Sequence, residues 1–175
     1  MAEFVFNQLQ YDWPTKWVSG TYLWIWNPDK IPPHIGISRG QNYFSLTYRQ
    51  CELQKNVQSL VRKTKRGKLP LVLVDLSDWS FQLDFTTVFQ QFECAKEGVA
   101  TCLTPIKAIM GMGDEILQLA DLLKEIERRG ELKQVFAVNL ETTYRGIRDY
   151  SVDEIMRAIK ELHEAKRSES TITSR

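Results

Sequence analysis

Histidine and cysteine are scarce in this sequence of 175 residues, which contains two histidines and three cysteines. These residues show none of the CxxC, HxxxH or HExxH spacings of common zinc sites, so no bound metal is expected. Glycine-rich phosphate loops of the form GxxxxGK(S/T) or GxGxxG are also absent, and no cofactor is expected. The cysteines at positions 51, 94 and 102 do not suggest a disulfide framework and fit a reducing compartment.

An excess of charge of either sign is also missing. The 23 Lys and Arg and the 22 Asp and Glu give a formal net charge of +1, so no nucleic-acid partner is expected. No run approaches the roughly 20 apolar residues of a membrane helix, and we expect no membrane span. The first 14 residues lack the basic start and apolar core of a signal peptide, which favours a cytoplasmic protein. With 43% hydrophobic residues, the sequence predicts one domain over 1–166 and a polar, frayed tail over 167–175.

Short β-like segments dominate the first third of the sequence. Residues 21–26 (TYLWIW), 34–38 (HIGIS) and 43–48 are rich in aromatic and β-branched side chains, and turn residues separate them. A Gly/Asn turn between the second and third segments predicts an antiparallel hairpin. The apolar runs at 69–76 and 134–140 predict two further, well-buried strands.

Helical patterns follow these strands. Leu53, Val57, Leu60 and Val61 have the spacing of one helix face, with Gly67 as the expected cap. Other helix starts are predicted near Asp84, Thr104, Asp114 and at the Ser151–Glu154 capping box, with ends at Gly98 and Gly130 for the Asp84 and Asp114 helices. We therefore predict an α+β (mixed α/β) fold, an antiparallel sheet with packed helices.

Only His34 and His163 could serve a histidine-dependent mechanism. His163 lies on a highly charged terminal helix, and we expect it to be exposed. His34 follows two prolines and opens a strand, so its backbone is stiff and its side chain lies at a sheet end. A half-buried imidazole bonded to a backbone carbonyl is the alternative interpretation of His34.

Among the cysteines, Cys102 is the candidate nucleophile because it lies at or just before a predicted helix N-terminus. Backbone N–H groups and the helix dipole would stabilise a thiolate there and lower its pKa. The same N–H groups could hold the oxyanion of a tetrahedral intermediate. The alternative interpretation of Cys102 is a small buried apolar residue, which is also the simplest view of Cys94 inside its predicted helix.

The segments around His34 and Ser45 resemble a known protein family. Residues 20–23 (GTYL), 34–40 (HIGISRG) and 43–45 (YFS) resemble the histidine-bearing hairpin of the papain-like cell-wall amidase superfamily. A histidine that precedes the cysteine resembles the circularly permuted branch, which includes lecithin–retinol acyltransferase-type enzymes. The resemblance covers about residues 17–110 and implies a permuted papain-like core with a C-terminal α/β extension. It further implies that His34 is the base, Cys102 the nucleophile and Ser45 the residue that orients the histidine.

The first functional hypothesis is a cysteine-dependent hydrolase or acyltransferase that acts on an amide, ester or thioester through the Cys/His pair. Its partner would be a small-molecule, peptide or acyl substrate. In this hypothesis Trp24, Trp26 and Tyr43 contact the substrate. The sequence indicates no oligomeric state.

Two other classes of protein remain open. One is a non-enzymatic interaction module that uses the aromatic-rich N-terminal face, where Trp13 and Trp17 also lie. The other is a small-ligand-binding α/β domain built from the strands at 69–76 and 134–140. In a doubly wound sheet, Asp75, Ser77 and Asn139 would line a site at the carboxyl ends of these strands.

Overall fold

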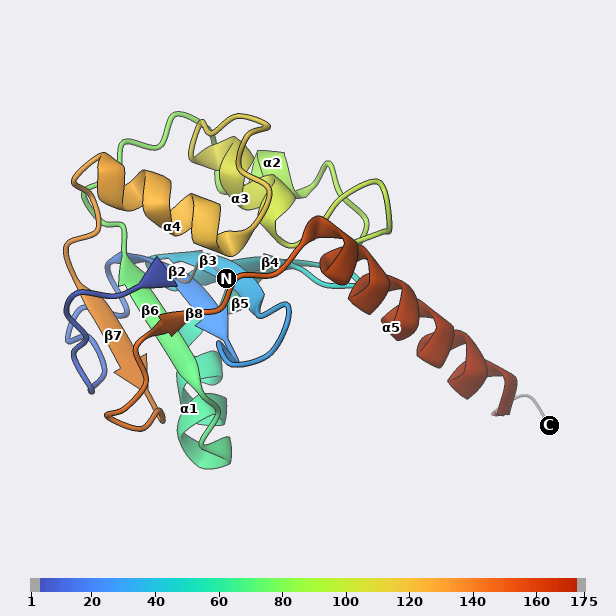
Figure 1. Cartoon of the computed structure of the whole chain (residues 1–175), viewed down its shortest axis with the longest axis horizontal. Helices are drawn as coiled ribbons and strands as arrows, with labels where there is room; N and C mark the ends of the chain where they lie inside the picture. Colours follow the sequence, from blue (N-terminus) through green and yellow to red (C-terminus); the bar gives the residue numbers. More distant parts are fainter. Residues whose placement is uncertain (1–3, 173–175) are drawn as a thin grey trace.

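The computed structural model describes residues 4–172, which form eight strands and five helices (Figure 1). The strands are β1 (Phe4–Val5), β2 (Thr21–Trp26), β3 (His34–Arg39), β4 (Asn42–Leu46), β5 (Cys51–Asn56), β6 (Leu71–Asp75), β7 (Val135–Val138) and β8 (Gly146–Ile147). The helices are α1 (Val57–Gly67), α2 (Phe85–Phe89), α3 (Leu103–Ile109), α4 (Leu119–Arg128) and α5 (Val152–Ile172).

Six strands form one sheet in the order β5-β4-β3-β2-β6-β7, and every neighbouring pair is antiparallel. Strands β1 and β8 pair separately. The predicted α+β class with an antiparallel sheet is therefore confirmed. The parallel, doubly wound arrangement is wrong, because β6 and β7 run in opposite directions. Asp75 at the end of β6 and Asn139 just after β7 consequently lie at opposite ends of the sheet.

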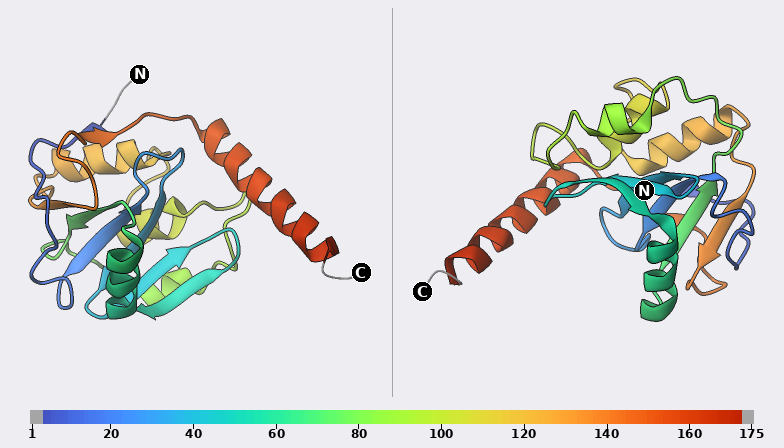
Figure 2. Two further views of the ribbon diagram at one scale, coloured as in Figure 1. Left: turned by 90° about the horizontal axis from the view of Figure 1, so that it is seen from below. Right: turned by 180° about the vertical axis from the view of Figure 1, so that it is seen from behind.

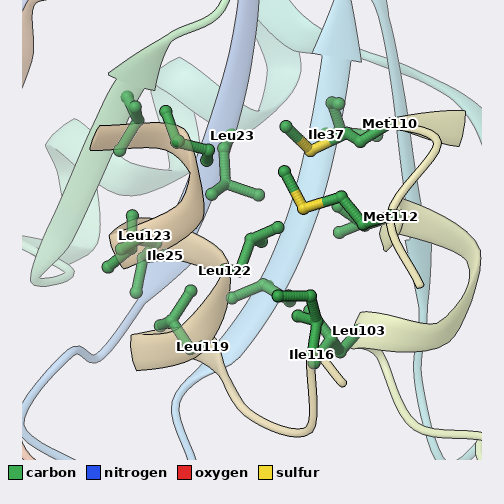
Figure 3. Packing of buried hydrophobic residues seen from close by; sticks show 14 of the residues in the cluster. Leu23, Ile25, Ile37, Leu103, Met110, Met112, Ile116, Leu119, Leu122 and Leu123 are labelled. Atoms are coloured by element: carbon green, nitrogen blue, oxygen red, sulfur yellow. The ribbon is translucent and has the colours of Figure 1, made fainter. Parts of the chain in front are cut away.

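Both faces of the sheet are covered, as expected when strand side chains alternate between faces. Helices α2, α3 and α4 cover one face, and α1 covers the other (Figures 1 and 2). On the first face, Leu23, Ile25 and Ile37 of the sheet meet leucines of α4 and the methionines that follow α3 (Figure 3). On the second face, Trp24 and Tyr43 pack with the apolar side of α1. The sheet thus separates two apolar cores.

Helix α1 starts later than the periodicity of the sequence predicts. Residues 51–56 form the edge strand β5, where Leu53 is 39% exposed, and the helix begins at Val57. Asn56 caps α1, because its side-chain oxygen accepts a 3.1 Å hydrogen bond from the Ser59 amide. At the other end Lys68, rather than Gly67, adopts the left-handed backbone conformation, with φ 48°.

The middle helices also differ from their predicted limits. Helix α2 stops at Phe89, so Cys94 lies in a loop rather than inside a helix. Helix α4 starts at Leu119 rather than after Asp114, and the Asp121 carboxylate accepts a 3.1 Å hydrogen bond from the Gln118 amide. The apolar residues Phe92 and Ala95 after α2, and Ile116 before α4, pack on the core from loops.

The capping box predicted at Ser151 and Glu154 is present, with hydrogen bonds of 2.7 and 3.2 Å between each backbone amide and the other side chain. Helix α5 continues to Ile172, so residues 167–172 are helical rather than a frayed tail, and residues 173–175 lie outside the described part. Its first turns contact the core through Ile155 and Ile159, and the rest extends away from the sheet (Figures 1 and 2). Over residues 4–172, no helix has the length and apolar character needed to cross a membrane.

Candidate active site

A cleft of about 580 Å³ lies between the loop that precedes β3, the end of β4 and the first turns of α5. Its walls are mainly apolar, and they include Ile31, Leu46, Ala95, Ile155, Ile159 and Leu162. His34 and Cys102 both line this cleft. An apolar cavity of this size with a few convergent polar groups is typical of small-molecule sites.

Cys102 occupies the N-cap position of α3, as the sequence predicts. The backbone amides of Ile35, Cys102 and Leu103 lie near enough to its sulfur to lower the pKa of the thiol. Strands β3 and β4 are paired only from Gly36 onward, so the Ile35 amide lies beyond the last pair of that ladder. The sulfur therefore lies close to the peptide unit that joins His34 to Ile35. The two side chains start from opposite sides of the sheet, because Cys102 packs against the α2–α4 core whereas His34 pairs with Trp26 of the α1 core.

Burial changes the expected chemistry of the thiol. Desolvation raises the pKa of Cys102, and the three backbone amides only partly oppose this effect. Helix α3 has seven residues, so its dipole adds little. The predicted lowering of the Cys102 pKa is thus wrong, because burial outweighs the N–H groups, and the group rests as a neutral thiol.

His34 is the first residue of β3 and is half-buried. Burial lowers the pKa of its imidazole, since the charged form loses water. The Glu52 carboxylate raises this pKa and the Lys55 ammonium lowers it, and the net pKa lies below the ordinary value. A neutral imidazole near neutral pH can accept a proton, which a general base must do.

Ser45 holds this carboxylate in place. It lies across from Gly36 on β3 and from Glu52 on β5, so these positions share one face of the sheet with His34. The Ser45 hydroxyl donates a 2.8 Å hydrogen bond to Glu52 Oε2, and Lys55 Nζ lies 2.8 Å from Oε1. Burial raises the pKa of Glu52, but the bonds from Lys55 and Ser45 outweigh burial and keep the carboxylate ionised.

Glu52 is therefore a functional candidate that sequence reasoning missed. The resemblance gives the orienting role to Ser45, whereas the hydroxyl contacts Glu52 and the carboxylate acts on His34 electrostatically. The sequence does show an acidic residue, Glu52, seven positions after Ser45. Its segment was interpreted as the start of a helix, so the pairing with Ser45 was not recognised. A hairpin between 42–46 and 51–56 would have placed the two side chains opposite each other.

Of the three aromatic residues expected to contact substrate, Trp24 and Tyr43 belong to the core, and Trp26 is partly buried against it. Trp24 and Tyr43 are 0% and 1% exposed, respectively, and lie on the α1 face of the sheet. Trp26 Nε1 donates a 2.9 Å hydrogen bond to the Tyr43 hydroxyl. The Trp24 and Tyr43 rings thus pack in the core rather than form a docking face.

Trp13 and Trp17 are partly buried against the same core, and the Lys65 ammonium lies 5.5 Å from the Trp13 ring centroid. The rings of Trp13 and Trp17 are therefore only partly accessible. His163, which we expected to be exposed, is half-buried, and its Nε2 lies 2.9 Å from the Ala95 carbonyl oxygen. This contact joins α5 to the loop that forms another wall of the cleft.

The residues of the small-ligand hypothesis have local structural partners. The Ser77 amide donates to Asp75 Oδ1 at 2.8 Å, and the Ser77 hydroxyl accepts from the Thr21 amide at 3.1 Å. Asn139 Nδ2 donates to the Leu69 carbonyl at 2.9 Å, at the other end of the sheet. These side chains close turns and do not converge on one site.

Within the described part of the chain, no group of three or more His, Cys, Asp or Glu side chains could hold a metal ion. Comparisons of the chain with protein-family models, with curated proteins and with solved structures find no match. The function proposed below therefore rests on the cleft, on its two candidate reactive residues and on the short motifs that resemble the permuted papain-like superfamily.

Proposed function

We propose that this chain is a cysteine-dependent hydrolase or acyltransferase of the permuted papain-like superfamily, which acts on an amide, ester or thioester. One observation carries the proposal. His34 and Cys102, 68 residues apart in the sequence, line the same apolar cleft, and the amide that follows His34 lowers the pKa of the Cys102 thiol. A thiol and a neutral imidazole in one apolar cleft are the groups that covalent acyl transfer requires.

The reaction starts from a neutral pair. The Cys102 sulfur attacks the carbonyl carbon of the substrate while its proton passes to His34, which forms a sulfur–carbon bond and an oxyanion. When the oxyanion collapses, the bond to the leaving group breaks and His34 returns the proton to that group. Water or an acceptor alcohol or amine then loses a proton to His34 and attacks the thioester. The thiolate that leaves takes the proton back and restores the thiol.

Glu52 has a positioning role in this reaction. The transient imidazolium of His34 is stabilised by the nearby carboxylate, which raises the pKa of His34. Ser45 and Lys55 keep that carboxylate ionised despite its partial burial. The apolar walls favour substrates whose acyl part is itself apolar.

The test is covalent trapping. We expect an apolar p-nitrophenyl ester to leave one acyl group on the protein, visible by intact mass and assigned to Cys102 by peptide mapping. Cys102→Ser should abolish the thioester, whereas the matched Cys94→Ser variant should not. His34→Gln should slow acylation about 10²- to 10⁴-fold, the range for loss of a general base. Acyl groups spread equally over the three cysteines, or no effect of His34→Gln in a folded protein, would contradict the proposal.

A further inference from the structure

Basic residues are concentrated in one stretch of the chain. Residues 53–74 contain six Lys and Arg and no Asp or Glu, whereas the remaining residues contain 17 basic and 22 acidic side chains. The near-neutral total therefore conceals a strong segregation of charge. A net charge averaged over the whole chain says little about any one surface when charges are distributed in this way.

Most of this charge lies on the last turns of α1. The side chains of Arg62, Lys63, Lys65, Arg66 and Lys68 are all exposed, and we call them the basic end of α1. Among the residues that the structure describes, none of these five forms an ion pair. One of them, Lys65, lies over the ring of Trp13.

The groups that cap the C-terminal end of α1 do not include any of these five charged side-chain groups. Asn139 Nδ2 donates to the carbonyls of Thr64 and Leu69 at 3.3 and 2.9 Å, and the Lys68 amide donates to the Thr64 carbonyl. One or two cations near a helix C-terminus are favourable, but five unpaired like charges within seven residues repel one another. Such a cluster gains stability from an anionic partner outside the chain.

The position of the basic end in the fold determines which kinds of partner can reach it. Helix α1 extends from the sheet, and its C-terminal end is its outermost part (Figures 1 and 2). The chain then returns to β6, where the Pro70 carbonyl accepts a 2.9 Å hydrogen bond from the Asn27 amide. Residue Asn27 begins the loop that carries Lys30 and Ile31 to the cleft. The basic end and the cleft-bordering loop thus share one end of the sheet.

We propose that the basic end of α1 docks the protein on an anionic lipid membrane. A protruding, convex cluster of cations can meet a flat anionic surface without bringing the rest of the molecule against it. Helix α1 exposes no large apolar side chain, so docking is electrostatic.

The experiment is sedimentation of the full chain with vesicles of phosphatidylcholine alone or with added phosphatidylglycerol. We expect binding only to the anionic vesicles, and its loss in high salt. Each Lys or Arg near such a surface contributes about fivefold to partitioning, so Lys63→Gln/Arg66→Gln should reduce it about 30-fold. The matched variant Arg157→Gln/Lys160→Gln, on exposed positions of α5, should change it less than about twofold.

Three outcomes would overturn the inference: no preference for anionic vesicles, an equal loss in both double variants, or α1-dependent binding to a single-stranded oligonucleotide that exceeds binding to vesicles. Circular dichroism spectra that match the unmodified chain would show that each variant is folded. Docking does not depend on the proposed chemistry, so Cys102→Ser should bind vesicles as the unmodified chain does. Failure of one proposal therefore leaves the other standing.

Discussion

The hydroxyl of Ser45 donates a 2.8 Å hydrogen bond to Oε2 of Glu52, across the pair of strands β4 and β5. This contact makes the edge strand part of the candidate site, although most of its side chains face solvent. The contact holds the ionised Glu52 carboxylate near the His34 imidazole. Burial lowers the pKa of this imidazole, and the carboxylate partly offsets that effect. Four tests address the Glu52–His34 pair, the titration of His34, the packing at Gly36 and the contacts of Asn139.

The first concerns the electrostatic link between Glu52 and His34. Because the carboxylate raises the pKa of His34, Glu52→Gln should lower the midpoint of the His34 titration further below its ordinary value of 6.5. The imidazole resonances can be followed by NMR, since the chain has only one other histidine, and His163→Gln assigns the signals. The acid limb of the proposed activity should move to lower pH in the same variant. An unchanged His34 midpoint would show that the two groups do not interact.

Stability should also depend on pH through His34. The unfolded chain binds a proton at His34 near pH 6.5, whereas the folded chain binds it only at lower pH. Between these values the unfolded state carries more protons, so the free energy of unfolding should fall as pH decreases below about 6.5, by at most about 1.4 kcal/mol per pH unit. Urea titrations at about pH 7.5 and about pH 5.5 measure the change. In His34→Gln this part of the loss should disappear, whereas His163→Gln should retain it.

The absence of a side chain at Gly36 makes room for Tyr43. A Cβ at Gly36 would overlap the Tyr43 hydroxyl oxygen, which accepts a hydrogen bond from Trp26 Nε1. Gly36→Ala should therefore destabilise the fold by about 1 to 3 kcal/mol, as overpacking of a core does. Urea denaturation gives the value. Gly67→Ala is the matched control, because its Cβ would lie 3.4 Å from Leu69 at a helical position and should be neutral or slightly stabilising.

Asn139 should matter for the attachment of α1 rather than for ligand binding. Its φ of 55° is in the left-handed region, and its amide group bonds two carbonyls at the end of α1. Asn139→Ala loses these bonds and adds backbone strain, so it should cost about 2 kcal/mol. Asn139→Gly tolerates the conformation and should cost about 1 kcal/mol. Equal urea midpoints for Asn139→Ala and the unmodified chain would refute this role.

The sequence predicted the parts of the fold whose own residues determine them. Residues 21–26 and 71–75 are apolar and β-branched enough to form strands in most contexts, and the capping box at Ser151 has a local signature. Strand β5 has neither property. Its polar residues become a strand because they pair with β4, and Leu53 matches the helical spacing of α1 only by chance.

The candidate site could be predicted only in part for the same reason. His34 and Cys102 are recognisable because each begins an element that local sequence predicts. Glu52 was missed because its role depends on how β5 pairs with β4, and the polar sequence of β5 does not predict a strand. The raised pKa of Cys102 is a property of surroundings brought together by folding, which adjacent residues do not encode.

The cleft has one wall from a segment that contributes nothing to the sheet. Ile155, Ile159 and Leu162 come from α5, whereas His34 and Cys102 are held by β3 and α3. A chain cut before Val152 would keep all the described strands and both candidate reactive side chains, but it would lose this wall of the cleft. In the proposed reaction, the apolar part of a substrate and the bond-making step therefore depend on different segments of the chain. Under that proposal, substitutions confined to α5 should change the preferred acyl group without replacing His34 or Cys102.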